Sequence, residues 1–186
     1  MNAFLQPIQP LDGEILLQIQ QHLRVDPLTA IMKFFTFLGN GGWFWIVCVA
    51  VLLCIPKTRK TGYAAALSLI FGFLVTNLLL KNLVARLRPF AEIEALIPLV
   101  AKPTDFSFPS GHTTASFAVA LVMVRMLPKK IGIPAVIVAA LVAFSRLYLG
   151  VHYPTDVLAG LLVAAVGSTL SVWFVRKKSE TELKAQ

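Results

Sequence analysis

Long runs of apolar residues follow one another along most of the chain, with the polar positions gathered between them. The clearest runs cover residues 61–86, 112–127, 131–150 and 154–175. Because the apolar positions are continuous rather than spaced at an amphipathic period, each run predicts a membrane-spanning helix. A helix over residues 61–86 would be about 39 Å long at ~1.5 Å per residue, enough to cross a bilayer with some tilt. The run 112–127 is short and depends on its flanking residues to span.

The first apolar run, residues 28–55, is interrupted by the glycine-rich segment 39–42. Two interpretations fit this pattern. The run is either one kinked span, or a short interfacial helix followed by a span that starts near Gly41. We prefer the second interpretation, because Lys33 would be costly near the centre of a bilayer.

Residues 11–24 show a different pattern, in which apolar and polar positions alternate at the period of a helix. The apolar positions are Leu11, Ile15, Ile19 and Leu23. This spacing predicts an amphipathic helix that lies on the membrane surface instead of crossing it. We therefore predict an all-α, polytopic transmembrane bundle of about five spans, with residues 1–27 as an interfacial segment, 28–175 as one transmembrane domain and 176–186 as a basic tail.

Composition supports a membrane protein and narrows the choice of partners. Of the 186 residues, 57% are hydrophobic and only 14% are charged, which excludes an ordinary soluble domain. The net charge of +8 could indicate a nucleic-acid partner. However, Lys and Arg cluster at the ends of the apolar runs, which favours a lipid bilayer as the partner and argues against nucleic acid.

The basic residues also predict an orientation in the membrane. The connections 57–60 and 128–130 and the tail from residue 176 hold nine Lys or Arg residues. These segments alternate with the loop 87–111 and the turn 150–153, so they share one side, which the positive-inside rule makes cytoplasmic. The loop, the turn and the N-terminal helix are then exterior. In a bacterium, this describes a multi-pass protein of the inner membrane whose loop 87–111 faces the periplasm.

Ionisable residues gather at the exterior ends of the predicted spans, where a functional role is the usual reason for them. Lys81 and Arg88 lie seven positions apart, so they would project from one helix face if the helix continues to Pro89. We assign Lys81, which lies deeper in the run, to function. Arg86 is interpreted as a residue whose side chain extends to lipid headgroups.

The segment around Ser110 predicts an anion site. Ser110 is a good N-cap for a helix that starts near Gly111. Such a helix start leaves several backbone N–H groups unpaired, and these favour a negatively charged ligand. His112 in the first turn adds a titratable group to this site.

A second histidine lies at the other exterior turn. Arg146 ends one apolar run, and His152 follows six residues later. Pro154 is expected to start the last helix, which places Asp156 in its first turn, where the carboxylate can reach back to the imidazole of His152. The remaining histidine, His22, is interpreted as an ordinary interfacial residue.

These residues form a set suited to phosphoryl transfer. Lys81, Arg88 and Arg146 would neutralise phosphate oxygens. One histidine would attack phosphorus while the other protonates the leaving oxygen. No Asp, Glu or His cluster fits a metal site, and Cys48 and Cys54 have neither metal-site nor disulfide spacing. We therefore expect neither a metal nor another cofactor.

The same residues carry a resemblance to a known family. They form three groups in chain order: Lys81 with Arg88-Pro89, then Pro109-Ser110-Gly111-His112, and last Ser145-Arg146 with His152 and Asp156. This three-part pattern resembles the signature of the type 2 phosphatidic acid phosphatase superfamily, which also contains the vanadate-dependent haloperoxidases. The resemblance implies that His152 is a nucleophile forming a phosphohistidine, that Asp156 orients it and that His112 is the general acid. It also implies metal-independent hydrolysis, with the phosphate held by Lys81, Arg88, Ser110, the Gly111 amide and Arg146.

The function implied by this resemblance is that of a membrane lipid phosphatase. An exterior site and a small chain favour undecaprenyl diphosphate as the substrate in a bacterium. Phosphatidylglycerophosphate, phosphatidic acid and diacylglycerol pyrophosphate are the alternative substrates. A haloperoxidase is disfavoured, because those members resemble larger soluble proteins. A non-enzymatic lipid scramblase or transporter is disfavoured by the intact set of His112, His152 and Asp156.

Overall fold

The computed structural model describes residues 5–184, so the first four residues of the predicted interfacial segment and the last two of the basic tail lie outside the described residues. Over this range the chain forms helices and no strand, which confirms the all-α prediction. In chain order the helices are α1 (Gln9–Leu23), α2 (Asp26–Gly39), η1 (Asn40–Gly42), α3 (Trp43–Cys54), η2 (Pro56–Thr58), α4 (Arg59–Phe73), η3 (Leu74–Leu80), α5 (Lys81–Val84), α6 (Pro89–Glu92), α7 (Gly111–Met126), α8 (Lys129–Tyr148) and α9 (Pro154–Lys184).

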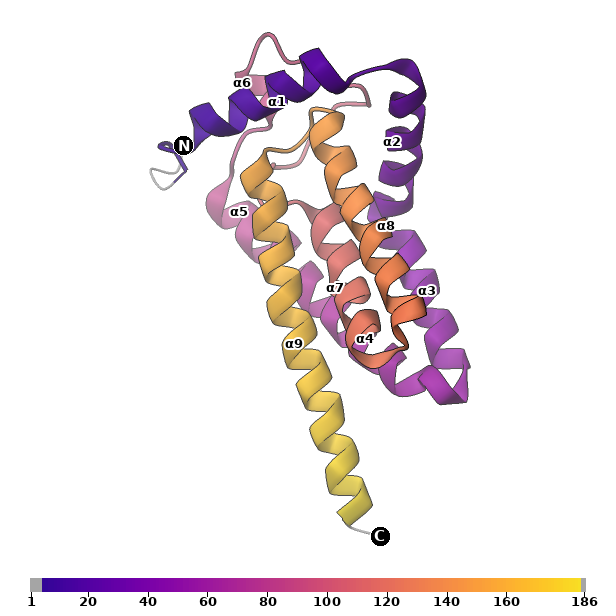
Figure 1. Ribbon diagram of the computed structural model, residues 1–186. Coiled ribbons are helices and arrows are strands. Elements are labelled where there is room, and N and C mark those ends of the chain that lie inside the picture. The colour runs from indigo at the N-terminus through magenta and orange to yellow at the C-terminus, as the bar shows by residue number, and fades with distance from the viewer. Residues whose placement is uncertain (1–4, 185–186) are drawn as a thin grey trace.

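Helix α7 lies at the centre of the bundle and packs against α4, α8 and α9 (Figure 1). Its buried residues are mostly small, which lets the neighbouring helices approach closely. The helices approach closely at Gly132 of α8, where an added Cβ would lie 2.4 Å from the Cα atom of Val124. The central position of α7 fixes the site, because α7 begins with Gly111 and His112.

Four segments are long and apolar enough to cross a membrane: Asp26–Cys54, Pro56–Glu92, Lys129–Tyr148 and Pro154–Thr181. Helix α7, which corresponds to the short predicted run 112–127, is not among them, because it has only 16 residues. At ~1.5 Å per residue it is about 24 Å long. The number of spans therefore stays a prediction.

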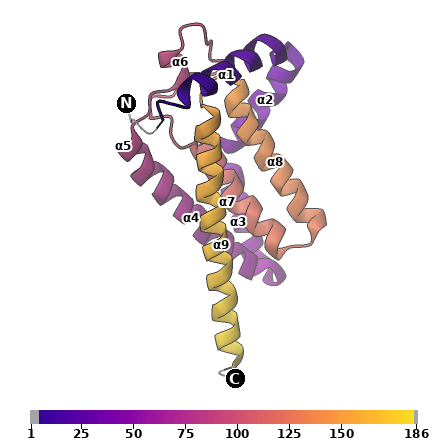
Figure 2. The same cartoon turned by 60° about the vertical axis from the view of Figure 1, so that its left-hand side comes forward.

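Helices α2 and α3 are separated by a kink within the glycine-rich segment 39–42. Gly41 and Gly42 have positive φ angles of 58° and 70°, a conformation that favours glycine. Beyond the kink the chain continues in α3, while α2 packs along α8 (Figures 1 and 2). This arrangement supports one kinked segment over the interfacial helix that we preferred from the sequence. Lys33 remains exposed, so its long side chain can extend toward a headgroup.

The helix that begins at α4 ends earlier than the sequence predicts. It passes through seven residues of π-helix in η3 and stops at Val84, because Ala85 adopts a left-handed conformation with φ of 47°. Arg88 then has extended backbone, as expected for a residue that precedes proline. Lys81 and Arg88 therefore do not share a helix face, and the prediction that placed them on one is wrong.

Helix α1 lies across one end of the bundle (Figures 1 and 2). Its buried residues are Asp12, Gly13, Leu16 and Ile19. Of the predicted apolar positions only Ile19 is buried, whereas Leu11, Ile15 and Leu23 stay exposed. Leu11, Ile15 and Leu23 are thus free to contact lipid, as expected for a helix on a membrane surface, although the surface position itself stays a prediction. The side of α1 that packs on the protein carries Asp12, which the sequence pattern did not single out.

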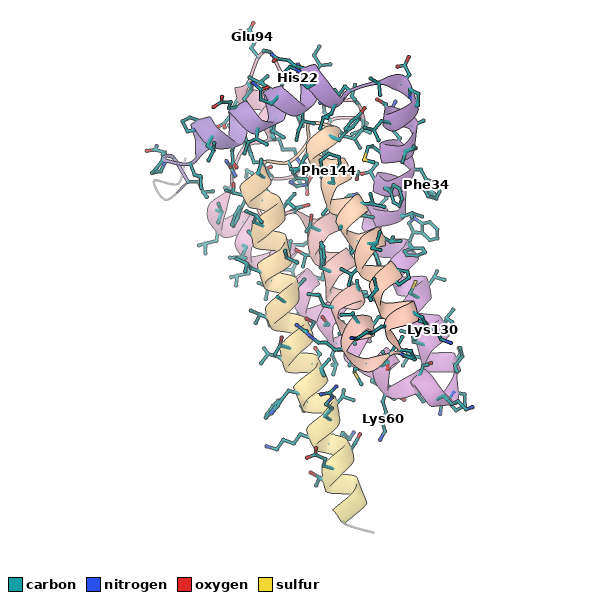
Figure 3. The ribbon with its side chains drawn as sticks, viewed as in Figure 1. His22, Phe34, Lys60, Glu94, Lys130 and Phe144 are labelled. Carbon is teal, nitrogen blue, oxygen red and sulfur yellow. The ribbon has the colours of Figure 1, made fainter. Side chains whose placement is uncertain are left out.

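Basic residues of the connections between helices lie at one end of the bundle. Figure 3 shows Lys60 and Lys130 at the end far from α1, whereas His22 and Glu94 lie at the end that α1 covers. The C-terminus extends beyond the Lys60 end (Figure 1). The basic connections that the orientation prediction uses therefore do share one end of the molecule.

Candidate active site

A cavity of about 700 Å³ lies beneath the end covered by α1 and the loop 93–110. It brings together residues that are far apart in the sequence. Among the predicted site residues, those that line it are Lys81, Arg88, Gly111, His112, Arg146 and His152. Asp156 and Ser110 are fully buried and do not line the cavity, so they act on it only through neighbouring groups.

His152 lies in the turn between α8 and α9 with only 1% of its surface exposed. Its Nδ1 atom is 3.4 Å from Oδ2 of Asp156, which confirms that the two side chains lie together. Its Nε2 atom is 3.3 Å from Nη1 of Arg88. A guanidinium can only donate hydrogen bonds, so Nε2 is the acceptor and the ring proton is on Nδ1. This tautomer leaves a lone pair on the nitrogen nearest the cavity cations.

Burial lowers the pKa of His152 to about 4, and the hydrogen bond with Asp156 opposes this shift. The positive charges of Arg88 and Arg146 lower the pKa further. The imidazole is therefore neutral at physiological pH, with a lone pair on Nε2 that accepts from Arg88 in this structure. A neutral histidine backed by a carboxylate can act as a nucleophile and gains stabilisation when it becomes a cation.

Asp156 is held in place by four hydrogen-bond donors besides the nearby His152. Its Oδ2 atom accepts from the hydroxyl of Ser107 at 2.5 Å and from the backbone N–H of Tyr153 at 2.8 Å. Its Oδ1 atom accepts from Nη1 of Arg86 at 2.8 Å. Its backbone carbonyl accepts from the N–H of Ser110, which ties the start of α9 to the start of α7. The carboxylate therefore has a fixed orientation.

Arg86 does not extend to lipid headgroups, and that sequence interpretation is wrong. Its side chain is 3% exposed and forms ion pairs with Asp156 and Asp12, each at 2.8 Å. Its guanidinium carbon also lies 3.7 Å from the centre of the Tyr153 ring. The sequence could not show this, because Asp12 and Asp156 are both about 70 residues away from Arg86.

Two of the cavity cations share a carboxylate that the sequence analysis did not single out. Asp105, on the loop before α7, pairs with Arg88 at 2.7 Å and also with Lys81. Burial alone would raise the pKa of Asp105, but hydrogen bonds and charges from Lys81 and Arg88 lower it to about 2. The carboxylate is therefore ionised at physiological pH and occupies cation contacts that a phosphate could take.

Arg146 differs from the other cavity cations because it has no carboxylate partner within residues 5–184. Its Nη1 atom donates to the hydroxyl of Thr36, while its Nε–H is buried without a hydrogen-bond partner in that range. The residue is 4% exposed and lines the cavity. A buried, unpaired guanidinium is costly unless an anion joins it, so Arg146 marks an anion position.

The start of α7 is built as the sequence predicts. Ser110 is the N-cap, and its hydroxyl accepts a hydrogen bond from the backbone N–H of Thr113 at 3.4 Å. The N–H groups of Gly111 and His112 have no backbone partner among the described residues. These two donors are therefore available to an anion at the helix N-terminus. Ser110 itself is committed to the cap rather than to the cavity.

His112 is held by a residue of the glycine-rich segment. Its Nε2 atom is 3.0 Å from Oδ1 of Asn40, and this amide oxygen accepts the hydrogen bond. Gly39 also lies against this ring, since an added Cβ there would be 2.6 Å from Cδ2 of His112. The break between α2 and α3 therefore makes room for the imidazole. The sequence marked this segment as a helix break but gave no sign of its contact with His112.

One wall of the cavity is apolar and lies toward the outside of the bundle. It is formed by Ile46 of α3 and by Leu69, Ile70 and Phe73 of α4. Ile46, Ile70 and Phe73 are each more than half exposed. The cavity therefore has a cationic end and an apolar side, which suits an amphiphilic ligand. Within residues 5–184 no three His, Cys, Asp or Glu side chains gather as a metal site.

The chain is similar in sequence to known proteins. Residues 61–180 match the PAP2 superfamily. The chain is 36% identical over 174 residues to the undecaprenyl-diphosphatase of Sulfolobus acidocaldarius, covering 91% of this chain and 84% of that protein. It is 38% identical over 141 residues to an undecaprenyl-diphosphatase of Bacillus subtilis, covering 75% of this chain and 70% of that protein.

A solved structure has a similar fold. It is that of a transmembrane PAP2 type phosphatidylglycerolphosphate phosphatase from Bacillus subtilis, with a TM-score of 0.70 and 30% sequence identity. The alignment covers 94% of this chain and 87% of that one. The similarity therefore includes the helices on both sides of the cavity.

Proposed function

This chain belongs to the PAP2 superfamily, and from that premise we propose that it is a membrane hydrolase that removes the terminal phosphate of undecaprenyl diphosphate. The observation that carries this proposal is the neutral, carboxylate-backed His152 at the wall of a cavity where Lys81, Arg88 and Arg146 converge. Such a site needs no metal, because the chain supplies its own positive charges.

In the first step, Nε2 of His152 attacks the terminal phosphorus. The bond between phosphorus and the bridging oxygen breaks as the new N–P bond forms. Lys81, Arg88 and Arg146, with the free amides at the start of α7, stabilise the charge on the phosphoryl oxygens. His112, protonated when the anionic substrate is bound, gives its proton to the leaving oxygen of the lipid monophosphate and becomes neutral. Asp156 accepts the Nδ1–H hydrogen bond and stabilises the positive charge on the phosphohistidine.

In the second step, water hydrolyses the phosphohistidine. His112, now neutral, takes a proton from the water as its oxygen attacks phosphorus. The N–P bond breaks, and its electron pair returns to Nε2 of His152. Inorganic phosphate leaves, and both histidines are back in their starting states. The lipid monophosphate is the other product.

The apolar side of the cavity supports a lipid substrate. A phosphate at the cationic end would place its lipid chain against Ile46, Ile70 and Phe73, between α3 and α4. These side chains are exposed at the surface that faces lipid in a membrane-embedded bundle, so the chain can remain in the bilayer during the reaction. A water-soluble phosphate would gain nothing from this wall.

A second substrate class has a specific observation in its favour. The solved relative with the TM-score of 0.70 acts, by its description, on phosphatidylglycerolphosphate. We keep phosphatidylglycerophosphate as the alternative for this chain, with phosphatidic acid and diacylglycerol pyrophosphate behind it. The two named undecaprenyl-diphosphatases favour the diphosphate as the first candidate.

We propose that the protein spans the cytoplasmic membrane several times, with α7 as one of five spans. Its cavity faces the exterior and its C-terminus is cytoplasmic. The gathering of Lys60, Lys130 and the C-terminus at the end opposite α1 supports this orientation, because basic residues are retained on the cytoplasmic side (Figure 3). The scramblase and transporter alternatives are disfavoured, since mere transport needs no acid–nucleophile pair.

The experiment that tests the substrate is a phosphate-release panel with the purified protein in detergent. Undecaprenyl diphosphate, phosphatidylglycerophosphate, phosphatidic acid and diacylglycerol pyrophosphate are compared by kcat/KM. We expect undecaprenyl diphosphate to have the highest value. A higher value for a glycerolipid would reassign the substrate, and no release from any of the four would overturn the lipid phosphatase itself.

A further inference from the structure

Behind His152, away from the cavity, three buried charges form a continuous chain. Arg86 lies between two carboxylates, with Nη1 2.8 Å from Oδ1 of Asp156 and Nη2 2.8 Å from Oδ2 of Asp12. The side chains of Asp12 and Arg86 are each 3% exposed, and that of Asp156 is fully buried. Thr155 completes the chain, because its hydroxyl and its backbone N–H both donate to Asp12.

This chain of charges is more than an anchor for α1. Leu16, Leu96 and Tyr153 already form an apolar contact between α1, the loop 93–110 and the site. Gln20 adds hydrogen bonds to Ala95 and Ile97. Burying three further charges is expensive, and replacing such groups by apolar residues commonly costs nothing. The position of Asp12 therefore calls for a role connected with charge.

The summed charge of these three side chains suggests that role. Asp12, Arg86 and Asp156 together carry one negative charge, which matches the single positive charge that His152 acquires when it is phosphorylated. Without Asp12, Arg86 would neutralise Asp156, and the cationic histidine would lose its balancing charge. Asp12 thus compensates Arg86, while Arg86 fixes the orientation of the Asp156 carboxylate.

We propose that Asp12 and Arg86 are positioning residues for the nucleophile, so that His152 is competent only when α1 is seated across the end of the bundle. This inference rests on the proposed function, in which His152 attacks phosphorus. Neither Asp12 nor Arg86 lines the cavity, so both act through Asp156 and not on the substrate. Helix α1 is then part of the catalytic unit rather than only a membrane-surface helix.

The test replaces Asp12 by Asn, which keeps the shape of the side chain and removes its charge. With undecaprenyl diphosphate as the probe, kcat of Asp12→Asn should fall about 10- to 100-fold, the loss that follows when a partner orienting a functional histidine is removed. KM should stay within about twofold, because the phosphate contacts are intact. Glu14→Gln is the matched control: it removes the same charge from an exposed position two residues away on α1, and it should behave as wild type.

The pH profile separates this role from simple loosening of the site. The charged and titratable groups around His152 are Asp12, Lys81, Arg86, Arg88, Asp105, His112, Arg146 and Asp156. In Asp12→Asn the charge of Arg86 is compensated only by Asp156, so the imidazolium is disfavoured and the acid limb of kcat/KM should move to lower pH. Loosening would hydrate the ring, raise its pKa from about 4 and move the limb to higher pH. A shift to higher pH overturns the proposal.

Arg86→Lys keeps the inference testable if Asp12→Asn does not fold. A lysine retains the charge but cannot donate to both carboxylates in the same geometry, so kcat should again fall with KM unchanged. A folded Asp12→Asn or Arg86→Lys with wild-type kcat overturns this inference alone. A wild-type protein that releases no phosphate from lipid phosphates overturns the proposed function and this inference with it.

Discussion

Asp105 is the residue that a substrate has to displace from the phosphate-binding cations. It pairs with both Lys81 and Arg88, and its side chain is 51% exposed, so it can leave them at moderate cost. In Asp105→Asn both cations lose their carboxylate partner, and KM for a lipid phosphate should fall about two- to fivefold, the size that an exposed ion pair is worth. The measurement is steady-state phosphate release against substrate concentration.

Glu94→Gln provides the control for this change, because Glu94 is an exposed carboxylate on the same loop (Figure 3). Its KM should match that of wild type. A KM that rises in Asp105→Asn would contradict the account, since Asp105 would then hold Lys81 and Arg88 in place for the phosphate instead of competing with it.

At the scale of single residues, the sequence predicted the side chains that line the cavity but not the buried charges that contact Asp156 from the other side. Lys81, Arg88, His112, Arg146 and His152 are ionisable groups at the ends of apolar runs, where a charge is costly and usually has a function. Local sequence shows that a group is unusual, whereas only the fold shows its partner. Asp12 and Arg86 therefore looked like interfacial residues, because their contact joins segments 74 positions apart.

At the scale of helices, the close approach of α7 and α8 holds the two halves of the site together. The start of α7 supplies His112 and the end of α8 supplies Arg146, while the helices pack closely at Gly132, near their opposite ends. A Cβ at Gly132 would lie 2.4 Å from Cα of Val124 and 2.9 Å from its backbone nitrogen, so the helices must separate. Gly132→Ala should destabilise the protein by about 1–3 kcal/mol, measured as a lower thermal midpoint in detergent.

Ala140→Leu is the matched change on the same helix. It adds a larger side chain at an exposed position of α8 and should leave the midpoint unchanged. If Gly132→Ala were as stable as wild type, the close packing of α7 on α8 would not be a feature of the protein in solution.

The sequence predicted which segments form helices more surely than where those helices end and which side of each is buried. Continuous apolar runs indicated α4, α7, α8 and α9, and Pro154 and Ser110 marked two helix starts that the structure confirms. The end at Val84 escaped prediction, because nothing local marks Ala85 as left-handed. The ion pair of Asp12 on the buried side of α1 escaped too, because its partner Arg86 is distant in the sequence.

At the scale of the whole molecule, the bundle has a basic end and an end that holds the cavity. We predict that a cysteine placed at Glu94 is labelled by a membrane-impermeant reagent from outside intact cells. Cysteines placed at Lys60 or Lys130 should be labelled only after the membrane is opened, because all three positions are exposed but lie at opposite ends (Figure 3). The background replaces Cys48 and Cys54, which are free thiols.

The reverse pattern, with Lys60 and Lys130 labelled from outside, would place the cavity in the cytoplasm. The phosphatase chemistry would survive that result, but the orientation would not. Exterior lipid diphosphates would then no longer be the expected substrates.

The central claim is that His152 forms a phosphohistidine without help from a metal. It is tested most directly by phosphate release from undecaprenyl diphosphate in detergent with excess EDTA, comparing wild type with folded His152→Ala. We predict that wild type keeps its full rate in EDTA and that His152→Ala loses about 10⁴-fold or more, as when a covalent nucleophile is removed. Activity that survives in His152→Ala, or wild-type activity that EDTA abolishes, would contradict the mechanism.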